Sequence, residues 1–287
     1  MYAGHFISIL TTILSSISIL IILSLGLGVI FGMRGIINLA HGEFVMLGAY
    51  MALGLVRVGI PFAGAVIGAG IAMGLVGAII ERTIVRRLYE RPLDCILATW
   101  GISLILVQGI TVLYGTNMSG LPIPFGNLRI YGETIGIYSL FLIPMAGALV
   151  LFTYFVFTRT RFGLQSRATM HASDTAEAVG INTSRINMFV FAMGSALAGL
   201  AGAVLFPYIG ITPTMGQNVI AEVLLTVMVG GTGFLSGVPL SAGILGGVQS
   251  GLAAWLTPFV GSLGLLALAI VIVRVRPNGL TSPRRKV

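Results

Sequence analysis

Residues 33–50 read MRGIINLAHGEFVMLGAY, and this stretch sets polar groups inside an apolar segment of membrane length. Its polar members are Asn38, His41 and Glu43. Moving a carboxylate from water into hydrocarbon costs several kcal/mol unless the group is paired, protonated or next to water. Ionisable residues in membrane segments therefore usually face the bundle interior or a wet cavity. The stretch predicts a membrane segment that handles something polar.

The composition indicates a polytopic membrane protein. Of the 287 residues, 56% are hydrophobic and 8% are charged, whereas soluble domains have about 25% charged residues. The mean hydropathy is +1.04. No stretch between the apolar segments is long enough for a soluble domain, so we expect residues 1–287 to form a single all-α membrane domain. The single cysteine, Cys95, excludes an internal disulfide and a cysteine metal site.

The apolar stretches have about the 20-residue length that a bilayer-spanning helix needs. They cover residues 7–30, 35–56, 60–80, 94–114, 137–158, 186–206, 219–236, 239–257 and 259–273. Glycines interrupt the stretches at 35–56 and 219–238, which predicts broken or re-entrant segments and a total of about eight to nine spans. The same glycines also suit close helix packing, as do those near residues 64–77 and 194–202.

The basic residues predict the topology, because Lys and Arg accumulate at the cytoplasmic ends of membrane helices. If the N-terminus is outside, all of the 16 Lys and Arg residues except Arg57 and Arg129 fall in segments on the cytoplasmic side. We therefore expect an external N-terminus and a cytoplasmic C-terminus in a bacterial-type inner membrane. The first span lacks a basic n-region, which predicts a retained helix. The net charge of +8 reflects topology rather than nucleic-acid binding.

One inner segment, residues 159–185, is polar and flanked by arginines: RTRFGLQSRATMHASDTAEAVGINTSR. Ser173 and Asp174 predict the N-cap of a short helix over 175–179, and Gly180 predicts its end. A permease driven by another protein needs such a helix on its cytoplasmic face. A helix that only seats the bundle against lipid headgroups would give the same pattern. The outer segment 115–136 is rich in turn residues and is interpreted as a connector.

Motifs for nucleotide, metal and hydrolytic sites are absent from the sequence. The only lysine is Lys286, so no P-loop with its phosphate-binding lysine exists. His5, His41 and His171 have no metal-ligand spacing, and neither Gly-x-Ser-x-Gly nor His-Glu-x-x-His occurs. The sequence therefore predicts a chain that is not an enzyme and holds no metal or cofactor.

Several blocks of the sequence resemble one family. Residues 35–50, GIINLAHGEFVMLGAY, resemble the signature of membrane subunits of ABC importers for branched-chain amino acids, short amides and urea. Further blocks agree with the family in order, so that the resemblance spans nearly the whole chain. They are residues 159–167 with 176–182, GSALAGLAG at 194–202, GGTGFLSG at 230–237 and RPNGL at 276–280.

The resemblance implies a division of labour among subunits. This chain would be a permease that pairs with a second homologous membrane subunit or with a second copy of itself. Two cytoplasmic ATPase subunits would bind ATP and Mg, and a soluble extracytoplasmic binding protein would deliver the substrate. Coupling to the ATPases would fall to Asp174, Thr175, Ala176, Glu177 and Gly180.

The substrate is predicted from two further similarities. RPLDCILATWGISLILVQ at residues 91–108 and the pair Gly216-Gln217 resemble the urea and short-amide branch more than the amino-acid branch. Import of branched-chain or other amino acids is the alternative. A small polar substrate needs hydrogen-bond donors and acceptors along its path. The candidates are Asn38, His41, Glu43, Thr99, Trp100, Ser103, Gln108, Glu222 and Thr226.

Other interpretations of these residues stay open. Glu43 either contacts substrate or binds backbone amides at a helix start. The hydroxyls of Thr99 and Ser103 also suit bonds to their own helix, and Trp100 suits packing. A proton-coupled secondary transporter with Glu43 and Glu222 as carriers is the alternative from another class. The lack of an evident repeat and the polar inner helix argue against it, and an intramembrane enzyme lacks a recognisable nucleophile.

Overall fold

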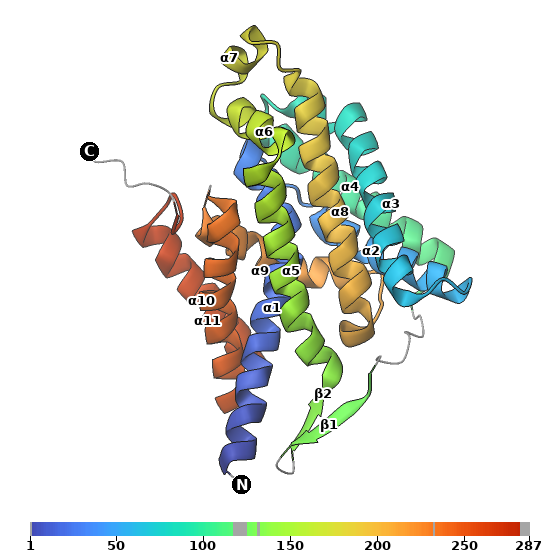
Figure 1. The fold of residues 1–287 in the computed structure, drawn as a ribbon, viewed down its shortest axis with the longest axis vertical. Helices are drawn as coiled ribbons and strands as arrows, with labels where there is room; N and C mark the ends of the chain where they lie inside the picture. Colours follow the sequence, from blue (N-terminus) through green and yellow to red (C-terminus); the bar gives the residue numbers. More distant parts are fainter. Residues whose placement is uncertain (1, 117–124, 131–132, 232, 282–287) are drawn as a thin grey trace.

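Long apolar helices form most of the molecule (Figure 1). The computed structural model describes residues 2–116, 125–130, 133–231 and 233–281. In this part of the chain, 6 helices are long and apolar enough to cross a membrane. They are α1 (Tyr2–Arg34), α3 (Phe62–Thr83), α4 (Pro92–Tyr114), α5 (Ile137–Arg159), α8 (Thr183–Ile209) and α11 (Pro258–Val275). The expected all-α, polytopic membrane fold is confirmed.

Two further helices are too short to span hydrocarbon about 30 Å thick. The helix α2 (His41–Arg57) has 17 residues and α9 (Met215–Gly230) has 16, which gives lengths of about 25 Å at 1.5 Å per residue. Both lie in the middle of the bundle (Figure 1). The helix α10 (Phe234–Trp255) is continuous over 22 residues and follows α9 after a short break. The glycine-rich stretches therefore do produce broken segments.

One break lies within the glycine-rich run 219–238 that predicts it, and the other lies before the start of α2. Residues 35–40 are irregular and α2 begins at His41, so the first break lies ahead of Gly42 and Gly48, two glycines of the predicted stretch 35–56 that are helical in the structure. The predicted boundary between spans 219–236 and 239–257 is wrong, because α9 begins at Met215 and α10 at Phe234. Gly231, directly after α9, has a φ of 79°. Side chains rarely allow this left-handed conformation, so the glycine ends the helix there.

The chain runs twice through the same order of elements. The order is long helix, irregular link, short helix, long helix, and it occurs over α1 to α3 and again over α8 to α10. The helices α1 and α8 run in opposite directions (Figure 1). They approach closely, since a Cβ on Gly194 would lie 2.7 Å from the Gly26 carbonyl oxygen. The two halves interlock, because α1 packs on α10 and α8 packs on α3. The sequence showed no repeat, but the architecture contains one.

Opposite ends of the bundle carry different smaller elements (Figure 1). At the end with the N-terminus, β1 (Asn127–Ile130) and β2 (Glu133–Gly136) form an antiparallel hairpin where a simple connector was expected. At the other end lie α6 (Arg161–His171), α7 (Ser173–Ala178) and the 3-10 helix η1 (Val85–Leu88). The predicted outer residues 117–124 and the basic tail with Lys286 lie outside the described residues.

The C-terminal segment closes the end of α9. The backbone N–H of Leu280 donates to the Val229 carbonyl at 2.8 Å, and the Thr281 hydroxyl donates to the Gly230 carbonyl at 2.7 Å. Carbonyls in the last turn of a helix have no partner within that helix. Leu280 and Thr281, which follow α11, supply those partners and so fix the C-terminal segment to the end of α9.

Candidate substrate pathway and cytoplasmic surface

The start of α2 is a buried polar turn. Asn38, His41 and Glu43 are all buried, with at most 1% of each exposed. The Asn38 side-chain carbonyl accepts from the Ala40 backbone N–H at 3.1 Å, and its backbone carbonyl accepts from the His41 N–H at 3.3 Å. Asn side chains commonly form turns of this kind. Asn38 thus builds the irregular link that starts α2 inside the bundle.

Two hydroxyls of α4 line this turn. The Thr99 hydroxyl accepts from the Leu39 backbone N–H at 3.2 Å and donates to the Ile96 carbonyl of its own helix at 3.0 Å. One turn further along α4, the Ser103 side chain hydrogen-bonds the Glu43 carboxylate. The structure therefore brings Asn38, Glu43 and these two α4 residues together, as a shared pathway wall requires.

His41 faces α1 instead. Its Nε2 lies 3.0 Å from the Leu23 carbonyl oxygen. A Cβ on Gly26 would lie 3.0 Å from the His41 ring. The ring therefore fits between α2 and α1 because α1 has no side chain at that point.

Several polar atoms around the turn have no hydrogen-bond partner among the described residues. They are Asn38 Nδ2, His41 Nδ1, Glu43 Oε2 and the Ser24 hydroxyl. Glu43 also hydrogen-bonds its own backbone N–H, which fits a carboxylate at a helix start. Glu43 thus combines a structural contact with a second oxygen that is free. Buried polar atoms without a partner are uncommon in folded proteins, so this turn is a candidate site for a polar ligand.

The first turn of α9 contacts the first turn of α2 at this point. A Cβ on Gly42 would lie 2.7 Å from the Gly216 carbonyl carbon, and a Cβ on Gly216 would meet the Gly42 backbone in turn. The N-terminus of a helix carries a partial positive charge and free N–H groups. Two such ends thus lie side by side in the interior of the bundle.

Glu222 lies in a different polar contact. Its carboxylate accepts from the Gln249 amide of α10 at 2.8 Å, and the Ser262 side chain of α11 bonds it too. Thr226, also on α9, is buried and donates to the Glu222 carbonyl of its own helix at 2.7 Å. These contacts tie α9 to α10 and α11. The Glu222 carboxylate therefore helps to hold these three helices together. The sequence did not predict this contact, because neither Gln249 nor Ser262 stands out in it.

The two remaining pathway candidates face outward. Trp100 is 53% exposed, on the same side of α4 as the exposed Leu97 and Leu104. Gln108 is also exposed. Their positions fit a face of α4 that contacts lipid or another membrane subunit.

The helix α7 forms where a short polar helix was predicted, with a different start. It covers Ser173–Ala178, and the N-cap is Ala172, which has no side-chain oxygen. The predicted cap by Ser173 and Asp174 is therefore wrong, because the chain already turns into the helix one residue earlier. Gly180 has a φ of 86°, and its N–H donates to the Glu177 carbonyl at 2.9 Å. This glycine ends the helix as predicted.

The coupling candidates of α7 lie at the molecular surface. Asp174, Thr175, Glu177 and Gly180 are exposed, and Ala176 is buried beneath them. The Thr183 hydroxyl, in the first turn of α8, donates to the Glu177 carboxylate. A short helix with an exposed acidic face is thus fixed to the start of a membrane helix.

A cleft of about 740 Å³ separates α7 from the segment around η1. Arginines form much of one wall, and the acids of α7 with the start of α8 form the other. The lining residues are Arg86, Arg87, Tyr89, Glu90, Arg91, Ser173, Asp174, Glu177, Thr183, Ser184 and Asn187.

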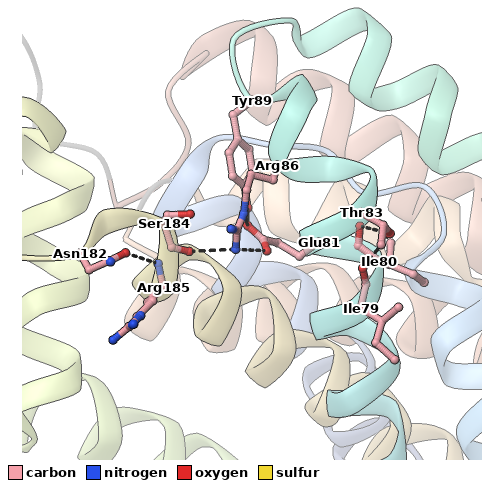
Figure 2. A network of polar contacts seen from close by, with 9 residues as sticks. All are labelled: Ile79, Ile80, Glu81, Thr83, Arg86, Tyr89, Asn182, Ser184 and Arg185. Carbon is pink, nitrogen blue, oxygen red and sulfur yellow. Dashed lines mark hydrogen bonds and ion pairs between the residues drawn. The ribbon is translucent and has the colours of Figure 1, made fainter.

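A buried acid lies behind this cleft, and it was not predicted. Glu81 of α3 is fully buried and forms an ion pair of 3.0 Å with Arg86. The Tyr89 hydroxyl donates to the same carboxylate at 2.8 Å, and Arg86 reaches the Ser184 carbonyl at 3.4 Å (Figure 2). Glu81 stands next to Arg82 in a row of charges at a span end, so the sequence alone marks it only as a topology charge.

Comparison with known proteins gives matches over nearly the full length. The family model described as the permease component of the branched-chain amino acid transport system matches residues 9–274. LivH of Salmonella typhimurium, a high-affinity branched-chain amino acid transport system permease protein, is 26% identical over 277 residues, 90% of each chain.

Other relatives are equally distant in sequence. BraD of Pseudomonas aeruginosa, also a high-affinity branched-chain amino acid transport system permease protein, is 26% identical over 293 residues, which cover 96% of this chain and 95% of the relative. LsrC of Escherichia coli, an autoinducer 2 import system permease protein, is 28% identical over 281 residues, 93% of this chain and 80% of the relative. No solved structure matches the chain significantly.

Proposed function

This chain belongs to the permease family of branched-chain amino acid transport systems, and we propose that it forms the membrane pathway of an ATP-driven importer for leucine, isoleucine and valine. The observation that carries the proposal is the extent of the family match. It runs from within α1 to the last turn of α11, and so it includes both the buried turn before α2 and the α6–α7 segment.

The family relatives support an amino-acid substrate over urea or a short amide. LivH and BraD are both named as branched-chain amino acid permeases. The similarity of residues 91–108 to the urea branch is a weaker argument, because Trp100 and Gln108 within it face outward. We therefore choose the amino-acid substrate and keep urea as an outcome of the test.

The chemistry of the buried turn supports the same choice. An amino acid carries an ammonium group, and Glu43 Oε2 is a buried carboxylate oxygen without a hydrogen-bond partner among the described residues. A buried carboxylate is costly without a positive partner, and urea, which is neutral, brings none. Asn38 Nδ2 and the adjoining starts of α2 and α9 are donors for the substrate carboxylate.

Access to this turn requires movement. Because Asn38, His41 and Glu43 are enclosed, a substrate reaches them only when the surrounding helices separate. We propose that ATPase subunits drive this separation through α7, whose exposed Asp174 and Glu177 form the contact surface. ATP and Mg would be bound by those partners, and a soluble extracytoplasmic protein would deliver the substrate. A homologous membrane subunit or a second copy of this chain would complete the pathway.

The topology proposed from the arginines suits this arrangement. The N-terminus and the β-hairpin share one end of the bundle, and α7 lies at the other (Figure 1). We propose that the end with α7 faces the cytoplasm, where ATP is available. The multi-pass chain would then have its N-terminus outside.

The test is the solute that stimulates ATP hydrolysis by the complex, reconstituted in lipid with its ATPases and binding protein. Leucine, isoleucine and valine should stimulate hydrolysis, and urea and acetamide should not. Stimulation by urea alone would reverse the substrate assignment.

A variant pair tests the proposed site. Glu43→Gln should reduce leucine uptake by about tenfold or more, because it removes the counter-charge for the ammonium group. Glu222→Gln is the matched control in α9, since a glutamine there still accepts from Gln249, and it should retain most of the uptake. Equal uptake by Glu43→Gln and wild type would refute the proposed contact.

A further inference from the structure

The ion pair of Glu81 and Arg86 lies at the proposed cytoplasmic end of α3, and Arg86 also contacts Ser184, which is far away in the sequence. Glu81 lies in the last turn of α3, and Arg86 lies in η1, which follows α3. Arg86 binds the Glu81 carboxylate through Nε at 3.3 Å and a terminal nitrogen at 3.0 Å, and the terminal nitrogen also reaches the Ser184 carbonyl in the first turn of α8. One guanidinium thus connects α3, η1 and α8 (Figure 2).

A further hydrogen bond connects the same turn of α8 to α7. The Thr183 hydroxyl donates to the Glu177 carboxylate of α7. Within the same turn of α8, the Asn182 side chain accepts from the Arg185 N–H at 2.9 Å as the N-cap. Thr183 and Ser184 are neighbours. The start of α8 is therefore the junction between α7 on one side and the Glu81–Arg86 pair on the other.

The Glu81–Arg86 pair is more buried and shorter than the exposed ion pair nearby. The Glu81 side chain is fully buried, whereas the nearby pair of Arg91 and Asp94 is mostly exposed and 3.9 Å long. Exposed pairs contribute little, whereas removing one partner of a buried pair leaves an uncompensated charge. A planar guanidinium with several bonds also fixes direction, which a lysine does not.

We propose that Glu81, Arg86 and Tyr89 are positioning residues that transmit movement of α7 to the membrane helices α3 and α8. The proposal rests on the proposed function, in which α7 receives the force of the ATPases. The helix α3 packs on α8 where Gly70 and Gly77 face it, and α8 packs on α2 at Val45, close to the buried turn. This junction is therefore a mechanical route from α7 to the pathway. The cluster touches neither ATPase nor substrate in this account.

The experiment measures leucine uptake and ATP hydrolysis together in proteoliposomes that contain the complete complex. Glu81→Gln keeps the shape of the side chain and removes its charge. Uptake per ATP hydrolysed should fall about tenfold, while the ATPases still assemble and still respond to leucine. Asp94→Asn, which removes the acid of the exposed pair in the same region, is the matched control and should behave as wild type.

Two milder variants separate positioning from stability. Arg86→Lys keeps the positive charge but loses the fork that reaches both Glu81 and Ser184, and Tyr89→Phe removes the hydroxyl that donates to Glu81. Both should lower uptake per ATP with little change in apparent Tm. If instead all variants lower Tm and keep uptake per ATP, the cluster only stabilises the fold and the proposal is overturned. If wild type itself shows no leucine-dependent ATP hydrolysis, the proposed function fails first.

Discussion

The contact between Gly42 and Gly216 gives the sharpest prediction for the fold. Both glycines lie in the first turn of a short helix, and each occupies the space that a side chain on the other would need. Gly42→Ala adds one methyl group. That group would lie 2.7 Å from the Gly216 carbonyl carbon and 3.1 Å from its Cα, so a backbone, rather than a flexible side chain, must move.

The magnitude follows from two opposing effects. Alanine is a better helix former than glycine by about 0.5–1 kcal/mol. Overpacking a well-filled site costs about 1–3 kcal/mol, and the rigid partner here favours the upper end of that range. We expect Gly42→Ala to destabilise the protein by about 1–2 kcal/mol net. Because α2 would be displaced from α9, leucine uptake should fall as well.

Gly54→Ala is the matched control, because Gly54 lies in the same helix and a Cβ there would meet nothing within 4 Å. Apparent Tm of the purified chain in one detergent compares the two variants. Gly42→Ala should melt below wild type, and Gly54→Ala should melt at or above it. If Gly42→Ala is as stable as Gly54→Ala, the close approach of α2 and α9 is wrong.

Three further predictions concern other parts of the molecule. Gln249→Leu leaves the Glu222 carboxylate without its amide donor at 2.8 Å, so the variant should lose about 1–3 kcal/mol of stability; a Tm equal to wild type would contradict the contact. Trp100→Leu on the outward face of α4 should keep uptake by the assembled complex within about twofold, because the side chain is 53% exposed; loss of uptake with intact assembly would place Trp100 in the pathway after all. Glu177→Ala combined with Gly180→Ala removes the bond to Thr183 and strains the end of α7. It should abolish leucine-stimulated ATP hydrolysis while the binding protein still binds leucine, and unchanged transport would exclude α7 as the coupling helix.

The sequence predicts the fold class because the membrane imposes strong constraints. Apolar length and the placement of arginines suffice to find the long helices, and α4 and α5 begin or end within two residues of the predicted spans. The breaks are harder to place. In a run such as residues 219–257, several glycines are available, and tertiary contact decides which of them ends a helix. The break at Gly231 depends on the C-terminal segment, since Leu280 and Thr281 supply the partners of the last α9 carbonyls.

The candidate site is predicted in part for a related reason. Asn38 and Glu43 are polar residues in an apolar stretch, and that contrast is visible in the sequence. Glu81 has no such contrast because it lies among charges at the end of α3, and only the fold reveals that it is buried. Glu222 and Trp100 show the reverse case. Both residue types suit a substrate pathway. In the structure, however, Glu222 contacts Gln249, and Trp100 points outward from α4.

The most direct test of the central claim is uptake of radiolabelled leucine into proteoliposomes that contain this chain, its membrane partner and the ATPases. ATP is supplied on the ATPase side and the loaded binding protein on the other. We predict uptake that requires ATP and the ATPases and that persists when a protonophore collapses the proton gradient. Uptake by the membrane chains alone, abolished by the protonophore, would identify a proton-coupled transporter and contradict the account.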